Sequence, residues 1–453
     1  MDPFDMSAEH PEPRRQQPYL NLSEDSFWVN IWEFIRILGN AIWKRFSLKV
    51  SESLKNLCCF FLLEMKRLPV DVDEDCLARI SQTRDWKTAA FRYIDCHPSS
   101  PSLLMALVTR EDTVLLYDES FKKRSCLRDL EQKHITCVAF RPWSQELAVG
   151  CSAGIFLWKS NWRSQVHRQI RHMQGTHHMR MLEDEGHTCV TSVQWNEDGT
   201  ILASAALGST HIILWEPDYQ QKMRLILDPG NQSSFSLLRF SADFKEILCA
   251  SLNGGASICE LDRCTWRVRD KVQIESRIQT AVWTTCSSHL LFVKEGSTRL
   301  YSRTRNQEAL LLKRPKPSWR IEMVANLQDA SCSGEWRHCG KPLAIAMDPL
   351  GIYLAVIFKH QSFVLLCLLA PARDGPPRPI PIKFIACDGD DATEDEVHPT
   401  CMAWHAVVQS NIFEKIRLLV ICWSTKHIQS YAVTSKSFEE AQRPQCKNYV
   451  NFG

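Results

Sequence analysis

Large apolar residues recur every three or four positions soon after the start of the chain, a spacing that is typical of one face of an α-helix. Residues 1–22, which place four prolines among polar side chains, predict a disordered tail ahead of this pattern. Glu24 and Asp25 then stand in what would be the first turn of a helix. Lys44 and Arg45 stand in its last turn, as the helix dipole favours.

The pattern predicts an apolar helical extension over residues 23–84. A second helix begins at Ser51, and a shorter third one spans residues 73–82. Faces this apolar cannot stay in water, so they either cover the main domain or dock onto a partner protein or a membrane surface. Three tryptophans on the first helix give more apolar area than a cover of the main domain needs, which favours docking. The predicted partner-binding residues are Phe27, Trp28, Ile31, Trp32, Ile35 and Trp43.

After Thr83 the helical spacing stops and a pattern of short alternating strands begins. A strand that closes on a large residue is followed by a turn with Pro, Asp or Gly and then by further apolar strands. Four-stranded propeller blades repeat about every 40–45 residues, and wider intervals predict insertions. The closing positions of the first strand in seven copies are Cys96, Phe140, Trp195, Phe240, Trp283, Met347 and Trp404.

A single blade cannot bury both of its faces, so blades must stack in a ring. The pattern therefore predicts an all-β, seven-bladed β-propeller over residues 86–434, preceded by the helical extension and followed by a C-terminal tail over residues 435–453. A terminal segment must complete one blade to close the ring. Either residues 70–86 or residues 445–452 could supply it.

Three wide intervals are predicted to be exposed loops. Residues 162–185 are basic and rich in histidine, residues 313–340 are mixed in charge, and residues 370–399 are rich in proline and then acidic. The basic run contains His167, Arg168, Arg171, His172, His177 and His178. We interpret it as a solvated loop, with a protein, RNA or metal contact as the alternative, because no further ligand stands at a suitable spacing.

Composition narrows the class of protein. The 54 basic and 52 acidic residues give a net charge of +2, which argues against a dedicated nucleic-acid binder. The 19 cysteines include no C-x-x-C pair and most of them fall in apolar runs, which predicts reduced thiols in the cytosol or nucleus. The N-terminus does not resemble a signal peptide, and no charge-free apolar run reaches the roughly 20 residues of a membrane helix.

No motif of catalysis is visible. The sequence lacks G-x-S-x-G, G-x-x-x-x-G-K-[ST] and H-E-x-x-H, and its paired carboxylates fall in the acidic run. Cys332, His338 and Cys339 are interpreted as a loop with free thiols. We therefore expect a protein that is not an enzyme, with no catalytic, cofactor-binding or metal-binding residue and no cofactor.

The repeat carries a weak WD-repeat signature. The Gly186-His187 pair heads one blade, and that blade's turn over residues 207–209 lacks the aspartate that usually bonds to such a histidine. The hydrogen-bond network is therefore predicted to be incomplete even there. The residues assigned to structural positions of the repeat are Tyr117, Trp158, His187, Trp195, Trp215, Trp283, Trp404 and Trp423.

Several segments together resemble the aladin family of WD-repeat nucleoporins. They include residues 85–98, 111–117, 186–193, 213–215 and 420–425, and the helices around residues 43–45 are also similar to that family. The resemblance covers roughly residues 26–433 and is strong at residues 186–215 and 418–425. Both ends of the chain are shorter than in vertebrate members.

The resemblance implies a WD40-type propeller that acts as a scaffold or adaptor of the nuclear pore complex. Its partners would be other nucleoporins, in particular a transmembrane nucleoporin that docks it at the nuclear envelope, with peripheral contact to the membrane and no direct nucleic-acid binding. It would support nucleocytoplasmic transport of selected cargo. In mitosis it would occupy the cytoplasm and the spindle or centrosome region, with spindle-associated proteins as partners.

Two other binding classes remain as alternatives. A membrane-surface trafficking propeller that binds phosphoinositides would carry a Phe/Leu-Arg-Arg-Gly motif, which this chain lacks. A ubiquitin-ligase substrate receptor would often close a blade with Trp-Asp-x-Arg, whereas Trp215 is followed here by Glu216, Pro217 and Asp218.

Overall fold

The computed structural model describes residues 73–159, 178–227, 234–262, 265–305, 319–372, 375–388, 397–407 and 416–433. The two helices predicted before residue 73 lie outside this part of the chain. The third predicted helix is present as α3 (Glu74–Ile80). In the described ranges no helix combines the length and the apolar character that crossing a bilayer requires.

Seven antiparallel sheets of three or four strands follow one another along the described chain, and we number them blades 1 to 7. Blade 1 contains β1 (Phe91–Cys96), β2 (Leu104–Thr109), β3 (Val114–Asp118) and β4 (Lys123–Leu127). Blade 2 contains β5 (Cys137–Phe140), β6 (Glu146–Gly150), β7 (Ile155–Lys159) and β8 (His178–Leu182). Blade 3 contains β9 (Val190–Trp195), β10 (Leu202–Ala206), β11 (Ile212–Glu216) and β12 (Gln221–Leu225).

The later blades repeat this order. Blade 4 contains β13 (Phe235–Phe240), β14 (Glu246–Ser251), β15 (Ala256–Leu261) and β16 (Val268–Ile274). Blade 5 contains β17 (Ile278–Trp283), β18 (His289–Lys294), β19 (Arg299–Arg305) and β20 (Trp319–Asn326), and a hairpin of β21 (Asp329–Cys332) and β22 (Glu335–His338) follows it. Blade 6 contains β23 (Pro342–Met347), β24 (Tyr353–Phe358), β25 (Phe363–Ala372) and β26 (Gly375–Ala386). Blade 7 contains β27 (Pro399–Val407), β28 (Ile416–Trp423) and β29 (Ile428–Val433).

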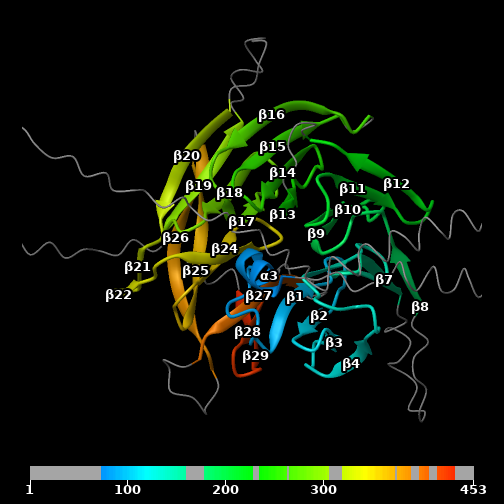
Figure 1. Cartoon of the computed structure of the whole chain (residues 1–453). Coiled ribbons are helices and arrows are strands. Elements are labelled where there is room, and N and C mark those ends of the chain that lie inside the picture. Colours follow the sequence, from blue (N-terminus) through cyan, green and yellow to red (C-terminus); the bar gives the residue numbers. More distant parts are fainter. Residues whose placement is uncertain are drawn as a thin grey trace, which may run out of the picture. The chain divides into compact units, whose positions relative to one another are not determined.

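The first strand of each blade lies next to the first strand of the following blade, and β27 lies next to β1, so the blades form a closed ring (Figure 1). The predicted seven-bladed propeller is therefore confirmed. Each interface between neighbouring blades holds a cluster of buried apolar side chains. At the closure between blades 7 and 1 the cluster includes Phe91, Met105, Cys401 and Val420. Burial of one such side chain contributes about 1.5–3 kcal/mol.

In blades 3, 5 and 7 the first strand closes on a tryptophan. The indole of each tryptophan forms a hydrogen bond to the preceding blade. The indole N–H of Trp195 donates to the carbonyl of Ala139 in blade 2 at 3.2 Å. Trp283 donates in the same way to Arg239 at 2.9 Å, and Trp404 donates to Ala346 at 3.1 Å. Three of the seven predicted closing positions therefore bond neighbouring blades to each other.

Where the closing residue is phenylalanine, the preceding blade supplies a polar side chain instead. The backbone N–H of Phe140 donates to the Asp95 carboxylate at 2.8 Å, and that of Phe240 donates to Gln194 Oε1 at 2.8 Å. Asp95 and Gln194 both occupy the position just before the closing residue of their own strand. Burial raises the pKa of Asp95 to about 7, although the hydrogen bonds to its carboxylate act in the opposite direction.

The predicted insertions are shorter than expected, because each contains a strand. Residues 178–182 form β8, and residues 319–326 form β20, the outer strands of blades 2 and 5. Cys332 and His338 lie on the hairpin β21–β22 rather than in a loop. The proline-rich residues 375–386 form β26, the outer strand of blade 6, where an edge position tolerates missing N–H groups.

Helix α3 covers one end of the ring (Figure 1). Asp73 caps it by accepting the backbone N–H of Asp75 at 2.9 Å, and Leu77 is buried. The helix lies over the start of the first strand in several blades. Arg277 donates to the carbonyl of Arg79 in the helix at 3.0 Å. The described residues 73–86 thus contain a helix and no strand, so they do not complete blade 7 as one of our alternatives expected.

A buried ion pair joins blades 4 and 5. The guanidinium of Arg303 on β19 contacts both carboxylate oxygens of Glu246 on β14, one of them at 3.2 Å. The side chains are 1% and 6% exposed, and Arg303 also lies over the ring of Trp283. Removal of one charge from a buried pair costs more than removal of both, because the remaining charge has lost its partner.

We expect Arg303→Met to lower the free energy of unfolding by about 3–5 kcal/mol, because it removes the guanidinium from the buried Glu246 carboxylate. The double variant with Glu246→Leu should recover much of that loss. The exposed Arg320 and its half-buried partner Glu322 provide the control, and Arg320→Met should have a far smaller effect. Denaturant unfolding measures all three, and equal effects of the Arg303 and Arg320 variants would contradict a structural role for the pair.

The histidine network of blade 3 has the predicted gap. His187 Nε2 lies 2.7 Å from Ser204 Oγ, and the indole of Trp215 donates to that oxygen at 2.8 Å. All three residues are buried. His187 Nδ1 is buried without a hydrogen-bond partner among the described residues, since residues 207–209 offer no carboxylate.

Burial lowers the pKa of His187 to about 4, and the neighbouring His211 makes a smaller contribution in the same direction. The unfolded chain takes up this proton as the pH falls from about 6.5 to 4, and the folded chain does not, so stability declines over that window. We expect His187→Gln to reduce this decline by up to about 1.4 kcal/mol per pH unit. Urea unfolding at pH 7 and pH 5 measures it, with the exposed His360→Gln as the control. An unchanged slope in His187→Gln would contradict the neutral, buried imidazole.

Candidate functional site

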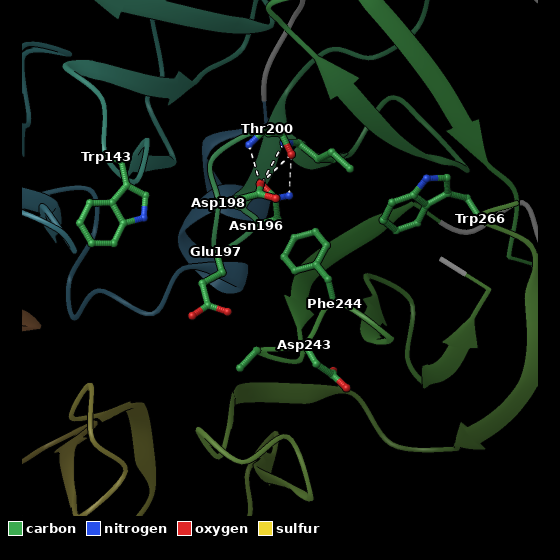
Figure 2. A pocket seen from close by; sticks show the side chains of 10 residues that line it. Trp143, Asn196, Glu197, Asp198, Thr200, Asp243, Phe244 and Trp266 are labelled. Carbon is green, nitrogen blue, oxygen red and sulfur yellow. Dashed lines mark hydrogen bonds between the residues drawn. The ribbon is translucent and has the colours of Figure 1, made fainter. Parts of the chain in front are cut away.

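A groove of about 590 Å³ opens on the face of the ring where first strands turn into second strands. The loops of blades 2, 3 and 4 form it, together with the loop between β15 and β16. Figure 2 shows Trp143 and Trp266 on opposite sides, with Glu197 and Phe244 between them. The lining residues are Trp143, Asn196, Glu197, Asp198, Thr200, Ile201, Ala242, Asp243, Phe244 and Trp266.

Trp143 forms one wall and is 78% exposed. Its backbone is left-handed, with φ of 58°, in the tight turn between β5 and β6. Arg141 fixes this turn because its Nε–H donates to the carbonyl of Gly199 at 2.6 Å and its Nη1–H donates to Glu146 at 2.7 Å. Because the turn keeps this large apolar side chain exposed to solvent, a partner protein can contact it.

The loops of blades 2 and 3 touch at Gly199. Its φ is 75°, and a Cβ atom there would lie 2.8 Å from the carbonyl oxygen of Pro142. Only glycine fits this approach without a shift of the backbone. The contact sets the distance between the Trp143 wall and the blade 3 loop.

The blade 3 loop presents a carboxylate to the groove. Asn196 accepts the N–H of Ile201 at 2.9 Å and donates to Thr200 Oγ1 at 2.9 Å. Asp198 accepts the N–H of Thr200 at 2.9 Å. These bonds shape the turn, and the side chain of Glu197 between them is exposed and points into the groove (Figure 2).

The blade 4 side combines aromatic rings with a second carboxylate. Phe244 stacks on Phe240 with ring centroids 4.0 Å apart, and Trp266 is half-exposed beyond it. Burial alone would raise the pKa of Asp243, but hydrogen bonds from Ser241 and Lys245 outweigh it and lower that pKa. Asp243 is therefore ionised, with the ammonium of Lys245 at 3.4 Å.

The groove carries an excess of negative charge. Its lining residues include three carboxylates and no cationic side chain. The nearby guanidinium of Arg141 is already shared between Glu146 and Asp218. The lining includes no Ser, Cys, His or Lys. Carboxylates between aromatic rings suit a lysine or arginine side chain of a partner.

None of the described residues that the sequence singled out lines the groove. The six predicted partner-binding residues of the first helix are outside the described part of the chain. Of the assigned repeat positions, Trp158 donates to Gln132, between β4 and β5, at 2.7 Å, and Trp423 donates to Gln429 of the same blade at 2.8 Å. Tyr117 lies half-buried on β3. Our sequence reading missed the groove, although a tryptophan that follows a proline in a predicted turn, as Trp143 does, was a usable signal.

Comparison with known proteins agrees with this architecture. Residues 179–216 match the family model described as WD domain, G-beta repeat. The β-propeller domain of Cps50 (Swd1) from Myceliophteria thermophila is similar in structure, with a TM-score of 0.50 and 14% sequence identity over 76% of this chain and 100% of that domain. Propellers of the WD40 type are usually non-catalytic scaffolds for protein interactions. The seven blades and these two matches show that the chain is a seven-bladed WD40-type β-propeller protein.

Proposed function

We propose that this chain is a non-catalytic scaffold of the nuclear pore complex that binds a basic segment of a partner protein in the groove of blades 2 to 4. The observation that carries the binding role is the exposed Trp143 beside the carboxylates of Glu197 and Asp198. The loops that hold these groups are fixed by hydrogen bonds, so little order has to be gained on binding.

The nuclear pore is proposed from the resemblance to the aladin family, which is strong at residues 186–215 and 418–425. The helical extension would dock onto a transmembrane nucleoporin and touch the nuclear membrane at its periphery, while the propeller presents its groove to other nucleoporins. This division would support transport of selected cargo and, in mitosis, contacts with spindle-associated proteins. Direct contact with nucleic acid is not part of the proposal.

A WD-repeat adaptor that acts elsewhere is the second candidate. It would be a trafficking propeller at a membrane surface or a substrate receptor of a ubiquitin ligase. An acidic groove that accepts a basic segment would serve a substrate receptor equally well. The location of the chain in the cell therefore separates the two candidates.

We expect Trp28→Ala combined with Trp32→Ala to move the full chain away from the nuclear rim, because the two changes remove apolar area from the proposed anchor. Fluorescence imaging of the tagged chain measures this. Trp336→Ala, at an exposed tryptophan of the propeller, is the matched control. Unchanged rim localisation in the double variant would exclude the anchor, and absence of the intact chain from the rim would exclude the nuclear pore.

We expect Trp143→Ala and Glu197→Gln each to weaken binding of a lysine- and arginine-rich peptide, roughly tenfold for the tryptophan, which corresponds to ~1.4 kcal/mol. The affinity should also fall as salt is raised. Fluorescence anisotropy of a labelled peptide measures both effects, and Trp336→Ala should bind like the parent chain. Equal binding by the parent and Trp143→Ala would place the peptide elsewhere.

A further inference from the structure

Three different metal-ligating side chains meet where blade 6 joins blade 7. Cys387 and Asp388 follow the last residue of β26, and His427 lies in the turn between β28 and β29. The ligand atoms of all three lie within 4.8 Å of one another. The cluster is not visible in the sequence, because the cysteine–aspartate pair and the histidine are far apart in the chain and form no known motif.

The backbone on both sides of the cluster is held by the sheets. Ala386, just before Cys387, pairs with Phe363. The carbonyl of His427 accepts the N–H of Trp423 at 2.9 Å, and Lys426 has a left-handed φ of 69° in that tight turn. The ligands are therefore positioned by two folded blades, and only their side-chain torsions remain to be adjusted. A metal site needs this kind of positioning.

The thiol distinguishes the cluster from an ordinary ion pair. His427 Nε2 lies 2.6 Å from Asp388 Oδ1, and that contact alone would need only the two residues. The sulfur of Cys387 adds a third ligand of a different chemical type at the same point. Ligand atoms around zinc stand about 3.3–3.6 Å apart, so a small rotation of the half-exposed His427 and the exposed Asp388 reaches that spacing.

We propose that Cys387, Asp388 and His427 bind a zinc ion. Thiolate and imidazole ligands favour zinc over calcium or magnesium, which prefer oxygen ligands alone. Three protein ligands leave a fourth position for water or for a side chain of a partner. The ion would tie blade 6 to blade 7 and would stabilise the folded chain in proportion to its occupancy. This inference is independent of the proposed function.

Cobalt(II) serves as the spectroscopic probe. The full chain, freed of metal by a chelator and kept reduced, should bind one equivalent of cobalt with a near-ultraviolet thiolate-to-cobalt absorption band, and zinc should remove the band. Cys387→Ser should abolish the band. Cys126→Ser, at another accessible cysteine, should retain it. Absence of the band in the parent chain, or its persistence in Cys387→Ser, would overturn the proposal.

Zinc affinity gives a second measurement. His427→Gln should weaken it by more than about tenfold, because even the loss of an outer hydrogen-bond partner of a ligand costs that much. A double change of His172 and His177 to Gln controls for zinc that binds the basic run and should leave the cobalt band in place. Zinc should raise the unfolding temperature of the parent chain but not of Cys387→Ser. An equal rise in the unfolding temperatures of the parent chain and Cys387→Ser would also overturn the proposed site. Equal unfolding temperatures of these two chains without metal would show that the variant folds.

Discussion

The ring depends on hydrogen bonds between the first strands of neighbouring blades. Where the first strand closes on tryptophan, as at Trp195, Trp283 and Trp404, the indole reaches a carbonyl of the preceding inner strand. Where it closes on Phe140 or Phe240, the preceding blade supplies a carboxylate or amide for the backbone N–H. Both devices satisfy a polar group at an interface that is otherwise apolar, and an unsatisfied group there would cost about 1–3 kcal/mol.

These bonds also explain how well the sequence predicted the fold. A large residue closes the first strand in most of the seven copies, so the repeat was visible without the structure. The outer strands were not visible in the same way. Few side chains of β20 and β26 are buried. Their mixed or proline-rich composition was indistinguishable from that of a loop. An outer strand is specified by its pairing partner more than by its own pattern.

The groove as a whole and the proposed zinc site were not visible in the sequence for a different reason. Trp143, Glu197 and Trp266 come from three blades, and Cys387 and His427 come from two. Their meeting depends on the stacking of the blades, which no local spacing encodes. The histidine network of blade 3 is the opposite case, since the missing aspartate was evident from residues 207–209 alone and left His187 Nδ1 without a hydrogen-bond partner in the described part of the chain.

The prolines of β26 bear on how this chain behaves beside other copies of itself. Pro377, Pro379 and Pro381 recur at every second position of an edge strand, and such a strand tolerates proline where the missing N–H would face away from its sheet. A strand from another molecule that approached this side of blade 6 would find oxygen acceptors but too few donors to build a ladder. Aggregation by strand addition would therefore have to begin at another blade.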